Sequence, residues 1–192
     1  SEYLDLLKRD NARIALSTHL SISPVALAAI VTGETPGNNG VNFDEGESRA
    51  LLEPLVPDIF EYAINRGKSV SYLEGTGNLI VTSVEPTYAL SDEETYNNAK
   101  EAIVSGKDLI FVHFHDPDDT NHEFGPLSTA SRTKVLYIES YIEYLVSQFD
   151  GKVIVVPDHG HNTLYDSENK PYGKHGMFTH YDMYVPYYVF NG

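Results

Sequence analysis

Two apolar runs in this sequence each end in a cluster of acidic residues and histidines. Residues 109–112 lead into the segment 113–126, and residues 153–156 lead into Pro157-Asp158-His159-Gly160-His161. Short apolar runs bounded by polar clusters are typical of buried strands. In an open α/β sheet, ligands bind beyond the carboxyl ends of the strands. We therefore expect the two clusters to converge and to bind a cation through carboxylate and imidazole groups.

The rest of the sequence alternates between strand and helix patterns. Strands are expected at residues 12–16, 69–73, 79–81, 108–115, 152–156 and 185–190, and helices at residues 2–10, 24–32, 57–66, 93–105 and 129–149. A turn-rich loop is expected at 35–40. This alternation predicts an α/β fold in which a mostly parallel sheet carries helices on both faces. A length of 192 residues suits one domain, spanning 1–192.

The composition excludes several classes of site. The 13 Lys and Arg against 28 Asp and Glu give a formal charge of −15, which repels polyphosphate backbones and argues against a nucleic-acid groove. Since there is no cysteine, any metal must be held by histidine and carboxylate, and the cellular compartment stays open. No apolar run approaches the ~18 residues of a membrane span, so no membrane segment is expected in this chain.

Two motifs each contain an aspartate and a histidine close together in the sequence. Asp118 and His122 have the spacing D-x-x-x-H after a strand, and a helical turn there would direct both side chains toward one ion. The alternative is a turn with a surface histidine. Asp158 and His159 are adjacent, so they can reach one ion only from an irregular loop; the alternative is a helix cap and its neighbour.

A third histidine follows near the end of the chain. His175 lies in the Gly-rich segment 172–176, where a tight loop can lower a side chain into a site, and His180 is an alternative ligand five residues later. Imidazole nitrogens combined with carboxylate oxygens favour zinc or manganese over magnesium alone.

Ser23 is a candidate nucleophile at the start of a helix. It precedes Pro24, and Gly33 ends the same pattern, which by itself predicts an ordinary helix N-cap. An alkoxide at this position would be stabilised by the N–H groups of the helix N-terminus and by an adjacent cation.

Five motifs follow one another in a fixed order. Ser23 lies ten residues before Gly33, the last residue of Ile30-Val31-Thr32-Gly33. The others are Pro36 with Gly40, the P-D-x-x-x-H-x-aromatic-G-P loop at 117–126, Asp158-His159-Gly160, and His175-Gly176 followed by Met183 and Val185-Pro186. In this order they resemble the alkaline phosphatase superfamily, and most closely its type I phosphodiesterase/nucleotide pyrophosphatase branch.

The resemblance implies a metal-dependent hydrolase of phosphate esters with two divalent ions, zinc before manganese, and a serine nucleophile. Its substrate would be a small phosphate ester or a nucleotide. The implied ligand sets are Asp118, His122 and His175 for one ion, and Asp158, His159 and the Ser23 oxygen for the other. Asn42 lies near the position where relatives place an Asn that touches the phosphoryl oxygens.

Three further histidines are expected near the site without binding metal directly. His113 and His115 lie two residues apart on a predicted strand and so face one side, where a hydrogen-bonded role is expected. His161 is expected to line the pocket.

The sequence departs from the family pattern in two places. Relatives supply a further Asp from the end of the first strand, and no strand ending in Asp precedes Ser23 here. The chain also stops at Asn191-Gly192, where relatives continue. We therefore expect an alkaline phosphatase-like core that lacks its first strand and its C-terminal end, with the second metal site one carboxylate short. As given, the chain is expected to bind at most one metal tightly and to be largely inactive.

Two other functions fit parts of the pattern. In a cofactor-independent phosphoglycerate mutase or phosphopentomutase, a metal-binding histidine lies six residues before the Pro of a Val-Pro pair, as His180 does before Pro186. A metal-binding module without turnover is the second alternative, and the missing carboxylate supports it.

Overall fold

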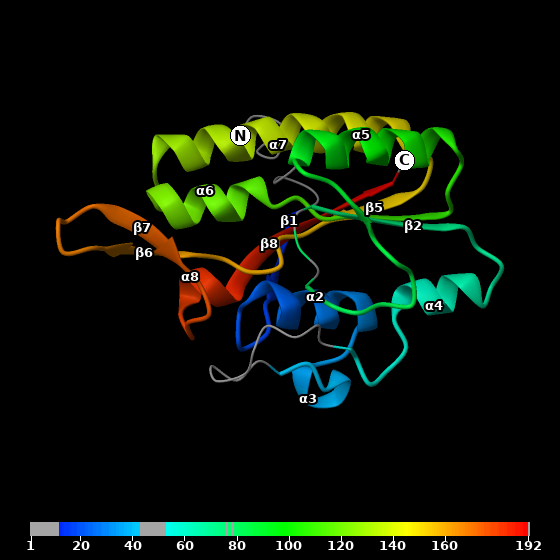
Figure 1. Cartoon of the computed structure of the whole chain (residues 1–192), viewed down its shortest axis with the longest axis horizontal. Coiled ribbons are helices and arrows are strands. Elements are labelled where there is room, and N and C mark those ends of the chain that lie inside the picture. Colours follow the sequence, from blue (N-terminus) through cyan, green and yellow to red (C-terminus); the bar gives the residue numbers. More distant parts are fainter. Residues whose placement is uncertain (1–11, 43–52, 76, 78, 192) are drawn as a thin grey trace.

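The computed structural model describes residues 12–42, 53–75, 77 and 79–191. Strands lie between two layers of helices (Figure 1). The elements α5 (Asp92–Val104), α6 (Asp116–Phe124) and α7 (Thr129–Gln148) lie on one side, and α2 (Ser23–Thr32), α3 (Pro36–Asn39) and α4 (Ile59–Ile64) on the other. The predicted α/β fold with helices on both faces is confirmed. The helix expected at 2–10 lies outside the described residues.

The strands form three hydrogen-bonded groups. β2 (Val70–Glu74) pairs in parallel with both β3 (Thr87–Tyr88) and β4 (Leu109–Val112). β8 (Tyr184–Asn191) lies antiparallel between β1 (Ala12–Leu16) and β5 (Lys152–Val155), so β1 and β5 run in the same direction. β6 (Asn162–Tyr165) and β7 (Pro171–Lys174) form an antiparallel pair. The antiparallel placement of β8 is not visible in the sequence, because apolar runs do not reveal strand direction.

One expected strand does not form. Residues 79–81 are not a strand, although Ile80 is fully buried in the hydrophobic core. The free edge of β2 pairs instead with β3, through Leu73↔Thr87 and Glu74↔Tyr88. Ile80 forms only an isolated β-bridge, so the apolar character of 79–81 reflects mainly core packing.

The start of α2 differs by one residue from the expectation. Ile22 is the N-cap and Ser23 is the first helical residue, so the Ser23 hydroxyl does not cap the helix. Pro24 still lies in the first turn, and Gly33 ends the helix in the left-handed conformation with φ 69°. Residues 36–39, expected as a loop, form the short helix α3.

An aromatic group forms the centre of the main core. The rings of Phe60 and Tyr72 stack with centroids 5.2 Å apart, and Phe111 packs edge-on against both. Buried side chains of α2, including Val25, Leu27 and Val31, complete this core beneath β2 and β4. α2 is therefore fixed against the sheet, and its first residue is held near the strand ends.

In the described residues, no helix combines the length and the hydropathy that crossing a bilayer requires.

Replacing Phe60 should test this core. Phe60 has no exposed surface, so Phe60→Ala should lower the free energy of unfolding by about 3–5 kcal/mol through lost burial and a cavity. Tyr62, in the same helix, is 51% exposed, and Tyr62→Ala should cost less than about 1 kcal/mol. Urea unfolding followed by circular dichroism measures both. Equal losses would contradict the assigned core.

Candidate metal centre

The chain enters the site directly after β4. Residues 113–115 connect β4 to α6, and Pro117 lies in the first turn of that helix. Asp118 and His122 are one turn apart on α6, and their Oδ2 and Nε2 atoms are 3.4 Å apart. The D-x-x-x-H spacing therefore lies in a helical turn, which was the condition for both side chains to reach one ion.

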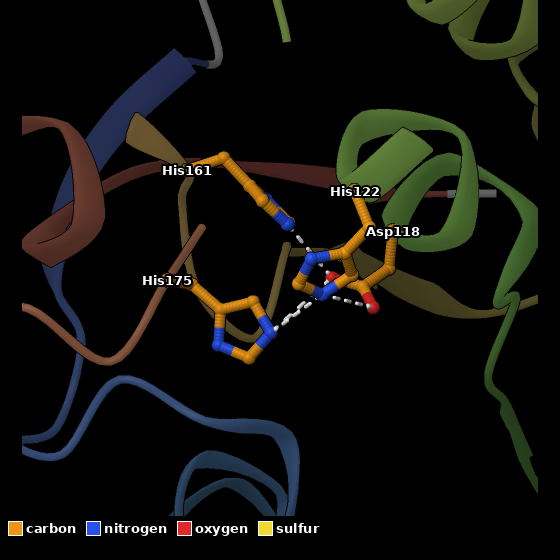
Figure 2. Close-up of side chains that lie close together, drawn as sticks. All are labelled: Asp118, His122, His161 and His175. Carbon is orange, nitrogen blue, oxygen red and sulfur yellow. Dashed lines mark hydrogen bonds and ion pairs between the residues drawn. The ribbon is translucent and has the colours of Figure 1, made fainter. Parts of the chain in front are cut away.

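Four side chains offer ligand atoms that all lie within 4.8 Å of one another: Asp118, His122, His161 and His175 (Figure 2). Asp118 Oδ1 is 3.0 Å from His161 Nε2 and 3.7 Å from His175 Nε2. The Nε2 atoms of His122 and His175 are 3.0 Å apart. The structure thus brings the first expected ligand set together. It adds His161, which the sequence placed only in the pocket lining.

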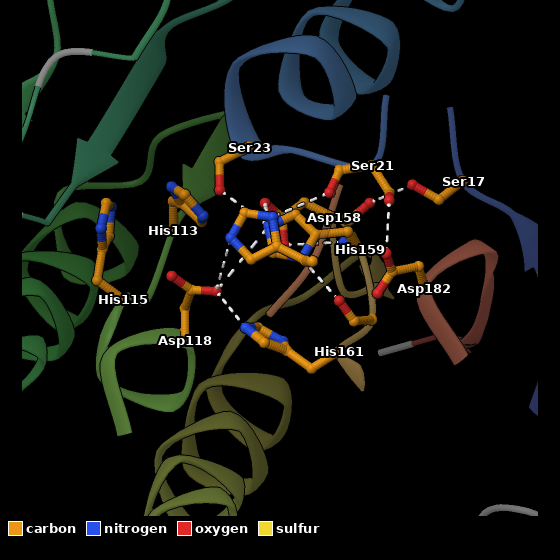
Figure 3. A network of polar contacts seen from close by, with 12 residues as sticks. Ser17, Ser21, Ser23, His113, His115, Asp118, Asp158, His159, His161 and Asp182 are labelled. Carbon is orange, nitrogen blue, oxygen red and sulfur yellow. Dashed lines mark hydrogen bonds and ion pairs between the residues drawn. The ribbon is translucent and has the colours of Figure 1, made fainter. Parts of the chain in front are cut away.

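The second expected set lies beside the first (Figure 3). Ser23 Oγ is 3.1 Å from His159 Nε2, and Asp158 Oδ2 is 3.3 Å from the same nitrogen. His159 Nε2 is also 4.0 Å from Asp118 Oδ1. The rings of His159 and His175 stack with centroids 3.9 Å apart, which joins the two sets.

Backbone carbonyl groups fix the orientation of three histidines. The Nδ1 atoms of His122, His159 and His175 lie 3.0, 3.1 and 3.0 Å from the carbonyl oxygens of Gly173, Gly160 and Ser21. A carbonyl oxygen only accepts, so each Nδ1 carries the proton and each Nε2 presents a lone pair to the site. Histidines that bind metal are commonly oriented in this way.

Three buried atoms at the same place lack a hydrogen-bond partner. They are Asp118 Oδ1, Asp158 Oδ2 and His161 Nε2. Leaving a buried polar atom unpaired costs roughly 1–3 kcal/mol, and more for a charged group. A cation bound at each carboxylate would satisfy these oxygens, so the residues present fit divalent metal ions.

The protonation states also suit metal binding. Burial opposes ionisation of Asp118, but contact with His161 and the fields of His159 and His122 lower its pKa to about 2. Burial, followed by the field of His159, lowers the pKa of His175 to about 4. At neutral pH the acid is therefore charged and His175 is neutral, which are the forms that bind a metal ion.

A buried acid that the sequence analysis missed holds the surrounding loops. Asp182 has no exposed surface and accepts hydrogen bonds from Ser21 Oγ at 3.3 Å, Asn162 Nδ2 at 2.7 Å and the Met177 N–H at 2.5 Å. These donors precede α2, begin β6 and follow β7 respectively. Asp182 lies in no recognisable motif, so only the tertiary structure reveals this function.

Two sequence candidates lie apart from these groups. Asn42 is exposed, and its Nδ2 donates to the Pro36 carbonyl oxygen at 3.4 Å. His180 is exposed at the start of α8 (His180–Met183), where its ring centroid is 4.6 Å from that of Tyr184. Neither belongs to a ligand group among the described residues. His113 and His115, by contrast, form a separate group with Glu74.

Gly160 should be essential for the position of the Asp158-His159 loop. A Cβ at residue 160 would overlap the Tyr181 carbonyl oxygen, so Gly160→Ala should destabilise the protein by about 1–3 kcal/mol. Gly37 in α3 is the matched control, because a Cβ there meets nothing within 4 Å. Gly37→Ala should be neutral or slightly stabilising. Thermal unfolding of both variants tests this, and an unchanged midpoint for Gly160→Ala would contradict the packing.

Known structures share this fold. The murine ectonucleotide pyrophosphatase/phosphodiesterase 5 matches with a TM-score of 0.61 and 17% identity, over 80% of this chain and 49% of that chain; an inactive variant of it is solved in complex with AMP. A phosphonoacetate hydrolase from Sinorhizobium meliloti matches with a TM-score of 0.66 and 16% identity, over 88% and 52%. This chain spans about half the length of both.

The periplasmic domain of a phosphoethanolamine transferase from Campylobacter jejuni has the same fold, with a TM-score of 0.63 and 14% identity over 95% of this chain and 69% of that chain. No curated protein sequence matches significantly. The family model of type I phosphodiesterase/nucleotide pyrophosphatase matches residues 68–179. Because that match covers more than half of the sequence, the chain belongs to the type I phosphodiesterase/nucleotide pyrophosphatase family, within the alkaline phosphatase superfamily.

Proposed function

We propose that this chain carries the catalytic centre of a metal-dependent phosphodiesterase or nucleotide pyrophosphatase, with Ser23 as the nucleophile. The observation that supports this most directly is the position of Ser23 Oγ, 3.1 Å from His159 Nε2. It lies in the network that holds the unpaired, buried oxygens of Asp118 and Asp158. A hydroxyl in this position meets its substrate beside two groups of cation ligands.

Each ion has its own set of side chains in this proposal. Asp118, His122 and His175 bind one ion, while Asp158, His159 and the Ser23 oxygen bind the other. The mixed nitrogen and oxygen donors suit zinc, with manganese as the alternative. When bound, such cations supply the positive charge that stabilises the attacking and leaving oxygens of phosphoryl transfer.

The reaction proceeds through a covalent intermediate on Ser23. Its hydroxyl proton passes to water, and Oγ forms a bond to phosphorus while the bond from phosphorus to the leaving oxygen breaks. The leaving group takes a proton from water. A second water then attacks the phosphorus of the Ser23-linked phosphodiester, the bond from phosphorus to Oγ breaks, and a phosphomonoester is released as the Ser23 hydroxyl is restored. As the first residue of α2, Ser23 is close to the free N–H groups that favour negative charge at a helix N-terminus.

His161 acts in this proposal as a positioning residue. Its Nε2 lies 3.0 Å from Asp118 Oδ1, so it can hold the carboxylate in its orientation.

The substrate class follows from the family and from the charge. The family name covers phosphodiesters and nucleotide pyrophosphates, and AMP is bound in an inactive variant of the murine neighbour. A chain with a formal charge of −15 disfavours long polyphosphates and suits small esters. The mutase alternative required His180 as a ligand, and its exposed position on α8 argues against that alternative.

Removing the nucleophile should separate catalysis from metal binding. In Ser23→Ala, kcat for bis-p-nitrophenyl phosphate should fall by roughly a thousandfold or more, while the zinc content stays largely unchanged. The control is Ser147→Ala, since Ser147 is exposed on α7. Comparison with p-nitrophenyl phosphate measures the preference for diesters. An unchanged kcat in Ser23→Ala would exclude the covalent route.

Removing a ligand should weaken metal binding. Asp118→Asn should lower zinc affinity by roughly a hundredfold or more, because even outer-shell partners contribute ten- to a hundredfold. Asp119→Asn is the matched control, since Asp119 is the exposed neighbour on the same helix. Competition with a chromophoric chelator gives both affinities. Equal affinities would show that Asp118 does not bind the metal.

A further inference from the structure

A second group of candidate ligands lies outside the sets described above. Glu74, His113 and His115 offer ligand atoms that all lie within 4.8 Å of one another. We propose that these three residues form an additional site for a divalent cation of the zinc type. This site does not depend on the proposed hydrolase activity.

The topology of the sheet brings the three residues together. β2 and β4 are parallel neighbours in which Leu73 pairs with Val112. The next residues, Glu74 and His113, therefore lie side by side at the carboxyl ends of the two strands. The N–H of His113 donates to the Leu73 carbonyl oxygen at 2.9 Å and extends this pairing. The cluster is therefore placed by backbone pairing and does not depend on a loose loop.

Two further features hold His115 in the cluster. A Cβ at residue 75 would lie 2.6 Å from His115 Cδ2, so Gly75 provides the space that this ring occupies. The buried Asp92 accepts the N–H groups of His115 at 2.8 Å and Asp116 at 2.9 Å. The backbone on both sides of the imidazole is thereby fixed.

The donor set suits zinc. Glu74 Oε1 lies 2.7 Å from His113 Nδ1 and 2.5 Å from His115 Nε2. Two imidazoles with one carboxylate occur in open zinc sites, where a water takes the fourth position. Ligands in a tetrahedral zinc site lie about 3.3 Å apart for bonds of ~2.0–2.1 Å. Each nitrogen needs to move away from Glu74 Oε1 by less than an ångström, and the side chains of His113 and His115, 16% and 17% exposed, have room to do so.

The buried charge of Glu74 requires compensation. Its side chain is 1% exposed, and Oε2 already accepts the Tyr72 hydroxyl at 2.5 Å. Burial opposes its ionisation, but hydrogen bonds to His113 and His115 lower its pKa to about 2, so the carboxylate is charged at neutral pH. Burial opposes protonation of His113, but contact with Glu74 raises the pKa of its imidazole, so a proton on His113 and a bound cation are alternative sources of the opposite charge. The cation differs in that it also bonds to His115 and Glu74 directly.

The site adjoins the centre described above. His113 interacts electrostatically with Asp158 of the second ligand set, and the close-up in Figure 3 includes His113 and His115 together with Ser23 and Asp118. A cation bound by Glu74, His113 and His115 would add positive charge beside the second ligand set, in which Asp158 is the single carboxylate.

Zinc content tests the proposal. Metal-free protein should take up one zinc equivalent more than Glu74→Gln or His115→Gln, by calorimetric titration with Zn²⁺ and by metal analysis after gel filtration. Asp118→Asn should lose the zinc equivalent that the Asp118 group binds, while the Glu74 group keeps its own. The double variant Asp118→Asn, His115→Gln should bind two equivalents fewer than wild type. His180→Gln should keep the wild-type number, because His180 lies in neither group. Mg²⁺ should not compete, since it prefers oxygen ligands.

A spectroscopic readout covers the case in which Glu74→Gln does not fold. In nitrogen NMR of the wild-type protein, added Zn²⁺ should produce coordination at Nδ1 of His113 and at Nε2 of His115, the atoms that face Glu74. Two results would overturn the proposal: unchanged resonances for both histidines, or the same zinc content in His115→Gln as in wild type. Either would show that Glu74 only forms ion pairs with protonated histidines. Loss of activity in Ser23→Ala is a separate outcome and does not affect this result.

Discussion

One carboxylate oxygen, Asp118 Oδ1, is the point on which the site depends. It is buried without a hydrogen bond, and the Nε2 atoms of His161, His175 and His159 lie 3.0, 3.7 and 4.0 Å away. These histidines come from the loop after β5 and the loop after β7, whereas Asp118 lies on α6. Such an arrangement brings a charge and several lone pairs together at a cost, because Asp118 Oδ1 itself accepts no hydrogen bond. A cation removes this cost, which is the strongest physical reason to regard the cluster as a metal centre.

Close backbone approach lets these segments meet. A Cβ at residue 160 would overlap the Tyr181 carbonyl oxygen, and one at residue 173 would overlap the Asn121 carbonyl oxygen. Both glycines therefore permit contacts that no other residue allows. Gly173 also presents its own carbonyl oxygen to His122 Nδ1. The glycines thus determine which ring nitrogen faces the site, in addition to forming turns.

Local motifs predicted a large part of this arrangement. Asp118 with His122, and Asp158 with His159, were found because each pair is close in sequence and follows a strand. The α/β fold followed from the alternation of apolar patterns. Ser23 was found from its distance to Gly33, although its hydroxyl contacts His159 and does not cap the helix.

What the sequence did not reveal depends on strand pairing and long-range contact. Glu74 ends a strand as an isolated acid, and its importance appears only when the register of β2 and β4 places it beside His113. Asp182 bonds to Ser21 across 161 positions of sequence. The apolar pattern also did not indicate strand direction: β8 lies antiparallel between β1 and β5. These features arise from tertiary pairing, for which one sequence carries no periodic signal.

Three acids at this end of the sheet would connect the stability of the fold to the binding of cations. Glu74 is the last residue of β2, Asp118 lies on the helix that follows β4, and Asp158 lies in the loop after β5, in a chain whose formal charge is −15. Bringing three carboxylates to one end of the strands is opposed by their mutual repulsion and by desolvation. A ligand that binds only the folded state stabilises it by RT ln(1 + [L]/Kd), about 2.7 kcal/mol at a hundredfold excess over Kd. Bound cations would therefore offset the cost of assembling the site, and the residues proposed for phosphoryl transfer are also those whose folded arrangement would gain most from a metal.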